Sequence, residues 1–181
     1  MFRRRAQRAM RRMGNPNVPP VLQRANKLMQ NEEYQEAADL FQELAQGAEE
    51  RFPQRAPFLY FEAGHAAILS GQSKIGVGHL RRGLTLFSSQ GRIARMQMAG
   101  HRIIDELQAR GMNAEAMEIS LLLEGNTPAG ISAAQPTPPK RPILPTHCPS
   151  CGAAVRPDDV EWLDDVTAEC DYCGSPVRAE D

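Results

Sequence analysis

Two short stretches, HCPSCG at residues 147–152 and CDYCG at residues 170–174, decide how the last part of this 181-residue chain folds. Each is a Cys-x-x-Cys pair followed by glycine, and 18 residues separate the two pairs. A tight turn of this kind points two thiolates at one ion, so two turns supply a tetrahedral set. The spacing therefore predicts one zinc ion bound by Cys148, Cys151, Cys170 and Cys173.

Both turns resemble the knuckles of the zinc ribbon family, and the resemblance extends from Cys148 to about Val177. Residues 160–169, VEWLDDVTAE, predict a short β-hairpin with an acidic turn between the knuckles. Four thiolates leave no open coordination position, so we expect the zinc to be structural and not catalytic. In a module with so small a core, the metal supplies the folding energy, on the order of 10 kcal/mol.

Other uses of the four cysteines fit less well. Disulfides would require export, but the N-terminal residues lack the apolar core and cleavage site of a secretory signal, which favours a cytoplasmic protein with reduced thiols. An iron site of the rubredoxin type uses similar knuckles with different spacing and surroundings. A two-zinc RING finger needs eight ligands, which the four cysteines and the adjacent His147 cannot supply. We expect His147 to be a loop residue.

The segment from about Pro19 to Glu124 reads as helix throughout, because it is rich in Ala, Leu, Gln, Glu, Arg and Met. Its stretch YQEAADLF, residues 34–41, resembles the second helix of a tetratricopeptide repeat, with Ala37 at the small position and Phe41 at the aromatic one. The frame recurs with Gly76 and, more weakly, with Ala116, at offsets of 39 and 40 residues. The resemblance implies three helical hairpins, and a generic helical bundle is the alternative.

Small residues should mark where the two helices of each hairpin cross. Gly64 against Gly76 would allow close approach in the second hairpin, and Ala25 against Ala37 in the first. The third hairpin has Ile104 at the corresponding place, which predicts looser packing there.

The predicted fold is mainly α, with three hairpins of a tetratricopeptide-like solenoid, a proline-rich linker and a small β zinc ribbon. The chain divides into four segments. The predicted segments are a basic arm (1–15), helical repeats (16–125), a proline-rich linker (126–147) and the zinc ribbon (148–181).

In tetratricopeptide proteins the first helix of each hairpin lines a groove that binds a peptide or a helix. Carried over, the resemblance implies groove positions at Leu22, Asn26, Met29, Phe58, Phe61, His65, Ile68, Met98, His101 and Asp105. Packing between the repeats is the alternative for each of these. Trp162 of the ribbon is either part of the small core or part of a docking surface for a protein partner.

The charge is distributed unevenly although the formal net charge is only −1. Residues 148–181 hold two arginines against nine acidic residues, which disfavours nucleic acid and favours a basic partner for the ribbon. The arm is basic and would form an amphipathic helix or a solvated tail. An anionic membrane or a nucleic acid would contact its six arginines, Arg3, Arg4, Arg5, Arg8, Arg11 and Arg12.

No catalytic motif is recognisable, with no phosphate loop, nucleophile elbow or His-Glu-x-x-His, and no small-molecule substrate is indicated. Repeats, linker and ribbon together predict a non-enzymatic adaptor or scaffold for protein–protein interactions. One alternative is a membrane- or nucleic-acid-associated factor recruited by the arm. Another is a zinc ribbon accessory of a ubiquitin-like protein-modification pathway.

Overall fold

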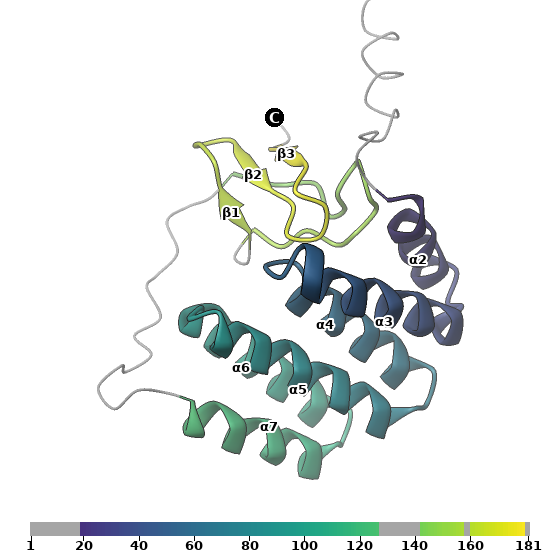
Figure 1. Ribbon diagram of the computed structural model, residues 1–181, viewed down its shortest axis with the longest axis vertical. Helices are drawn as coiled ribbons and strands as arrows, with labels where there is room; N and C mark the ends of the chain where they lie inside the picture. The colour runs from purple at the N-terminus through teal and green to yellow at the C-terminus, as the bar shows by residue number, and fades with distance from the viewer. Residues whose placement is uncertain (1–18, 127–141, 158–159, 180–181) are drawn as a thin grey trace, which may run out of the picture.

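The computed structural model describes residues 19–126, 142–157 and 160–179, so the arm and most of the linker lie outside the described residues. In the described part, six helices pack against one another and a small three-stranded antiparallel sheet follows (Figure 1). The helices are α2 (Pro20–Gln30), α3 (Tyr34–Arg51), α4 (Ala56–Leu69), α5 (Ser73–Ser89), α6 (Ile93–Ala109) and α7 (Asn113–Gly125). The strands are β1 (Glu161–Trp162), β2 (Thr167–Glu169) and β3 (Pro176–Arg178).

One kind of turn follows α4, α5 and α6. Gly71, Gly91 and Gly111 have φ angles of 86°, 70° and 76°, a left-handed conformation that glycine adopts at little cost. After α4, the Gly71 N–H donates to the Ile68 carbonyl oxygen at 3.0 Å, and equivalent bonds follow α5 and α6. This arrangement satisfies the last carbonyls of the helix while reversing the chain, so successive helices pack antiparallel. After α2, Glu32 occupies the same place with φ 63°.

The helices α4 and α5 approach closely where the sequence has glycine, as predicted for Gly64 and Gly76. A Cβ atom on Gly76 would lie 2.7 Å from the Gly64 carbonyl oxygen, and one on Gly64 would lie 2.9 Å from that of Gly76. Farther along, a Cβ on Gly83 would lie 2.9 Å from the Pro57 carbonyl oxygen. The backbones therefore touch along this pair, with no room for larger residues.

The pair α6 and α7 also has a small residue at its contact, one helical turn before the expected position. Gly100 is buried against the side chain of Leu123, where a Cβ would clash. Ile104 lies half-buried at the margin of the core, so the close approach does not depend on it.

Two apolar cores run through the molecule and meet at α4. The first joins α2, α3 and one side of α4 to the C-terminal module, which is the part described at residues 142–157 and 160–179. The helical part of this core is rich in alanine. The second lies among α4, α5, α6 and α7 and is built from larger side chains, including Leu80, Leu84, Phe87, Met96, Leu107 and Ile119. The module is therefore continuous with the first core and is not a separate body.

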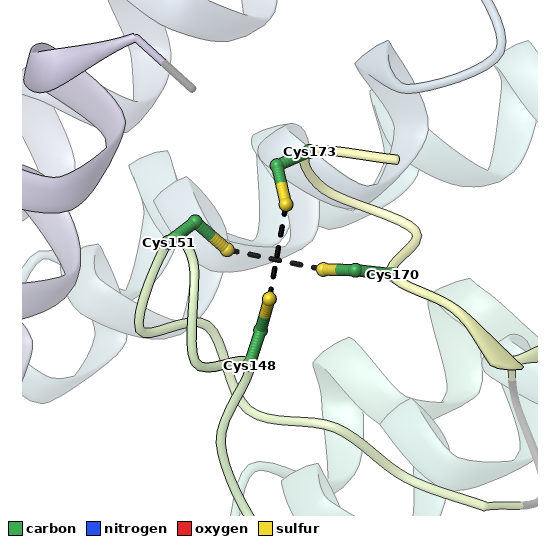
Figure 2. A group of neighbouring side chains, drawn as sticks. All are labelled: Cys148, Cys151, Cys170 and Cys173. Carbon is green, nitrogen blue, oxygen red and sulfur yellow. Dashed lines mark hydrogen bonds between the residues drawn. The ribbon is translucent and has the colours of Figure 1, made fainter. Parts of the chain in front are cut away.

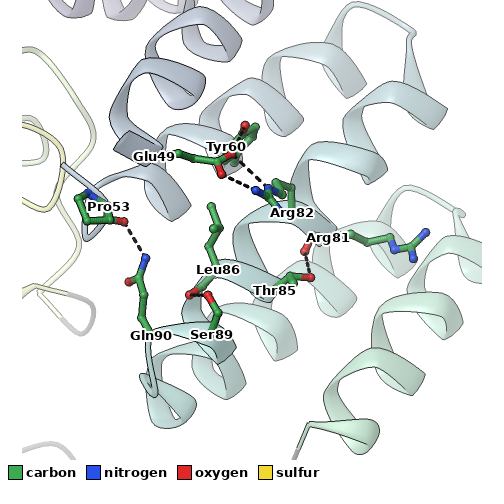
Figure 3. Close-up of polar contacts among 9 residues, drawn as sticks. All are labelled: Glu49, Pro53, Tyr60, Arg81, Arg82, Thr85, Leu86, Ser89 and Gln90. Atoms are coloured by element: carbon green, nitrogen blue, oxygen red, sulfur yellow. Dashed lines mark hydrogen bonds and ion pairs between the residues drawn. The ribbon is translucent and has the colours of Figure 1, made fainter. Parts of the chain in front are cut away.

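Polar contacts on the outer side join α3, α4 and α5 (Figure 3). Glu49 accepts a hydrogen bond from the Tyr60 hydroxyl at 2.6 Å and pairs with the Arg82 guanidinium. Burial and the bond to Glu49 raise the pKa of Tyr60 to about 12, so the phenol stays a donor. The Gln90 amide donates to the Pro53 carbonyl oxygen at 2.7 Å, which fixes the connection between α3 and α4 against the end of α5.

Candidate metal centre

The two Cys-x-x-Cys-Gly stretches fold into matching turns. Gly152 and Gly174 have φ angles of 81° and 71°, which explains why glycine ends each stretch. The Gly152 N–H donates to the Cys148 carbonyl oxygen at 2.9 Å, and the Gly174 N–H donates to that of Cys170 at 2.7 Å. Each turn thereby brings its two thiols to one side, as the local sequence predicts.

The four sulfur atoms converge on one point from opposite sides (Figure 2). All lie within 4.8 Å of one another, and the pairs Cys148–Cys173 and Cys151–Cys170 are each 3.8 Å apart. A tetrahedral ion with metal–sulfur bonds of about 2.3 Å requires sulfurs about 3.8 Å apart. The four thiols are unbridged and lie close enough together to hold a metal ion.

The four thiols lie close enough together to affect one another's pKa values. The hydrogen bond with Cys151 lowers the pKa of Cys148 to about 7, while hydrogen bonds with Cys148 raise the pKa values of Cys151 and Cys170. Four thiolates cannot crowd together unless positive charge offsets their repulsion. A divalent cation supplies that charge and displaces the remaining protons.

A three-stranded sheet in the order β1-β2-β3 supports the knuckles. The predicted hairpin corresponds to β1 and β2, with Trp162 opposite Ala168; the third strand, which pairs Val177 with Ala168, was not predicted. Trp162 is half-buried against the module core, and its indole N–H donates to the Pro157 carbonyl oxygen at 3.2 Å. His147 is exposed and bridges to Ala154, outside the group of four cysteines.

The first knuckle lies on α2. The Asn26 side-chain amide donates to the Cys151 carbonyl oxygen at 2.9 Å and to the Leu22 carbonyl oxygen at 3.0 Å. Gln23 donates to the Ser150 carbonyl oxygen at 3.1 Å. Asn26 is 5% exposed, so its hydrogen bonds are made away from water, where leaving a partner unsatisfied costs most.

The second knuckle contacts α4 and α6. The Tyr172 hydroxyl donates to the Glu62 carboxylate at 2.6 Å, and its ring lies 5.9 Å from that of Phe58. The Arg95 guanidinium donates to the Asp171 carboxylate at 2.8 Å. Sequence reasoning did not single out Glu62 or Arg95, since no local motif marks a residue whose partner is 76 or more positions away.

The expected groove positions separate into two groups. Most of those on α2 and α4 are buried, namely Leu22, Asn26, Phe58, Phe61 and Ile68, while Met29 and His65 are partly buried. On α6, Met98 is 47% exposed, and His101 and Asp105 are exposed. Phe61 and Ile68 pack against α5 at Gly83 and Gly76, which is the alternative of packing among the helices. The module contacts α2 at Asn26 and α4 at Phe58, whereas α6 presents its positions to solvent.

A cavity of about 190 Å³ lies between the module and the helices α4 and α6. Its lining includes Phe58, Phe61 and Met98 from the helices and Val155 and Tyr172 from the module. The lining is mixed, because ionisable side chains such as Glu62, Arg102 and Arg156 lie beside these apolar ones. The cavity is the space that remains between the module and these helices.

His65 and Glu106 form an ion pair at the same cavity, with 2.9 Å between the imidazole Nε2 and a carboxylate oxygen. Burial opposes the charged imidazolium, but the hydrogen bond to Glu106 and the nearby Glu62 outweigh it and raise the pKa of His65. The His65 hydrogen bond in turn lowers the pKa of Glu106 to about 2. Both groups are therefore more often charged near neutral pH than they would be in water.

Comparison with known proteins finds no matching family model, no similar curated protein and no similar solved structure. Among the described helices, none has the length and apolar character needed to cross a membrane. The function must therefore be argued from the site itself.

Proposed function

We propose that this protein is a non-enzymatic adaptor for protein–protein interactions, built from three tetratricopeptide-like hairpins and a structural zinc ribbon. The hairpin assignment α2–α3, α4–α5 and α6–α7 is supported by the recurring left-handed turns and by the glycines at the helix crossings. The helices that come first in these pairs, α2, α4 and α6, make the side-chain hydrogen bonds to the knuckles. The cavity is lined by α4 and α6 together with Phe87 of α5.

Zinc is the metal we propose for the four cysteines. An all-sulfur set favours zinc, copper(I) or iron over the hard cations that prefer oxygen, and a 3.8 Å sulfur spacing suits a tetrahedral ion. Because four thiolates complete the shell, the metal has no position left for a substrate. Metal analysis of the purified full-length chain tests this proposal: one zinc per chain supports it, and one iron with rubredoxin-like absorption contradicts it.

The observation that carries the adaptor proposal is the exposed side chain of Met98 at a cavity that is lined in part by aromatic rings. Met98 is 47% exposed and lines the same cavity as Phe58 and Phe61, which are almost fully buried. Methionine adapts its shape to different apolar partners, and an exposed one beside aromatic rings suits a peptide-binding edge.

Affinity capture with the full-length protein tests this proposal. We expect a protein partner that is retained by wild type, lost with Met98→Glu and kept with Met117→Glu. Met117 is a suitable control because it is 68% exposed on α7 and is absent from the cavity lining. Capture of nucleic acid or anionic lipid alone, lost when residues 1–13 are deleted, would instead favour recruitment through the arginine arm.

A further inference from the structure

The contacts between the module and the helices fall on the metal-binding knuckles themselves. Ser150 and Cys151 accept hydrogen bonds from α2, and both belong to the first knuckle. Asp171 and Tyr172, which contact α6 and α4, are the two residues between the metal-ligating cysteines of the second knuckle. The conformation that binds the metal and the conformation that binds the helices are therefore one conformation.

We propose that metal occupancy controls access to the helical groove: the metal-bound module covers the face formed by α2 and α4, and loss of the metal uncovers it. The proposal rests on the metal centre of the proposed function and extends it from a structural role to regulation. The occupant of the closed groove is the chain's own module.

Loss of the metal removes what holds the knuckle turns in shape. The strands of the module have two or three residues each, so apart from the turn hydrogen bonds and the contacts with the helices, the metal is what fixes residues 148–152 and 170–174. The carbonyl of Cys151 and the side chain of Tyr172 would then lose their fixed positions, and the hydrogen bonds to Asn26 and Glu62 would lose their geometry.

Uncovering the groove would expose an apolar surface suited to a partner. Leu22 and Phe58 are 3% and 9% exposed while the module is in place, and Phe58 lies against Tyr172. Linkage requires the effect to be reciprocal: a partner that binds the uncovered face weakens metal binding by the same factor by which the metal weakens partner binding.

Carbene footprinting of the full-length chain, read by mass spectrometry, measures this exposure at side chains. The chain is compared as the zinc-loaded form and after treatment with a zinc chelator, with metal content measured in both. We expect labelling of α2 and α4 to rise severalfold on zinc removal, and labelling of α7 to stay constant because it belongs to the other core.

A charge-reversal variant separates undocking from metal loss. Arg95→Glu places a carboxylate opposite Asp171 and near Glu161, so the module should leave the helices while keeping its zinc at saturating zinc. We expect increased labelling of α4 and a zinc affinity about tenfold lower, since docking no longer supports the metal-bound form. Arg81→Glu is the matched control, because Arg81 pairs with Glu118 of α7, away from the module.

Each outcome has a defined meaning. Zinc binding with increased labelling in the chelated protein and in Arg95→Glu, but not in Arg81→Glu, supports the proposal. Zinc binding with unchanged labelling of α2 and α4 overturns it and leaves the metal centre intact, whereas absence of any bound metal overturns both. If chelation also increases labelling of α7, the protein has unfolded generally, and zinc-loaded Arg95→Glu decides the matter.

Discussion

The two halves of the helical region, α2–α3 and α5–α7, differ in the side chains that they bury. In α2 and α3 the buried residues are mostly alanine, with Phe41 as the largest, and their core continues into the module through residues such as Cys148 and Val155. In α5, α6 and α7 the core is made of Leu, Ile, Phe and Met, and it closes with help from α4. Larger side chains bury more apolar area per residue, so the second half is the more self-sufficient.

Because α2 and α3 bury mainly alanine, the module supplies the apolar side chains that this half of the helical region lacks. Small residues let helices approach closely but leave little surface to bury, and the module covers what remains. The first half should therefore depend on the metal, while the second should not.

Removing a metal ligand should have the largest effect on this comparison. Cys170→Ser replaces one buried thiolate with a poor zinc ligand, so we expect loss of bound zinc and of most of its folding contribution, which is on the order of 10 kcal/mol for structural sites. Zinc content and thermal unfolding measure the result. A variant that keeps one zinc per chain and unfolds at the wild-type temperature would contradict the proposed centre.

The close contact between α4 and α5 can be tested by placing alanine at each of two nearby glycines of α5 in separate variants. Gly76→Ala places a methyl group 2.7 Å from the Gly64 carbonyl oxygen and should cost about 1–3 kcal/mol of unfolding free energy. Gly78→Ala has nothing within 4 Å and should stabilise the same helix by up to about 1 kcal/mol. Denaturant unfolding measures both. Equal effects would show that the close crossing is not a constraint.

A smaller effect is expected from the hydrogen bond between α2 and the first knuckle. Asn26→Leu keeps the approximate size but removes the donor to the Cys151 carbonyl oxygen, which should cost about 1–3 kcal/mol in the zinc-loaded protein. In the chelated protein the knuckle no longer presents this carbonyl, so the cost should shrink. Denaturant unfolding measures the loss of unfolding free energy caused by Asn26→Leu in both forms of the protein. Equal losses with and without zinc would show that the module is not held on α2.

The smallest effect concerns the ion pair at the cavity. The raised pKa of His65 means that its stabilising contribution is full below about pH 6.5 and is lost as the pH rises through the folded-state value. Relative to His65→Gln, the wild type should therefore be more stable at about pH 6.5 than at about pH 8.5, by under about 1 kcal/mol because the pair is partly exposed. Unfolding of zinc-loaded protein at the two pH values measures this, and a constant difference would argue against the pair.

The local features could be predicted from the sequence. The Cys-x-x-Cys-Gly spacing brings together four sulfurs that lie within 4.8 Å of one another, and the glycine pair Gly64 and Gly76 marks a real helix crossing. Both depend on residues whose geometry is set within a turn or a hairpin.

What could not be predicted depends on contacts between distant parts of the chain. Nothing around Glu62 or Arg95 indicates a partner in the second knuckle, and nothing around Asn26 indicates a carbonyl 125 residues away. The third strand was missed because three residues beginning with proline carry little periodicity. The prediction of a proline-rich linker did not indicate where the module would lie.

Hydrogen exchange of the full-length protein, with zinc and after chelation, tests most directly whether the metal supports one half of the helical region. We predict that amides of α2 and α3 exchange much faster once zinc is removed, while those of α6 and α7 keep their protection. Unchanged exchange in α2 and α3 despite complete loss of zinc, or an equal increase in both halves, would contradict the account.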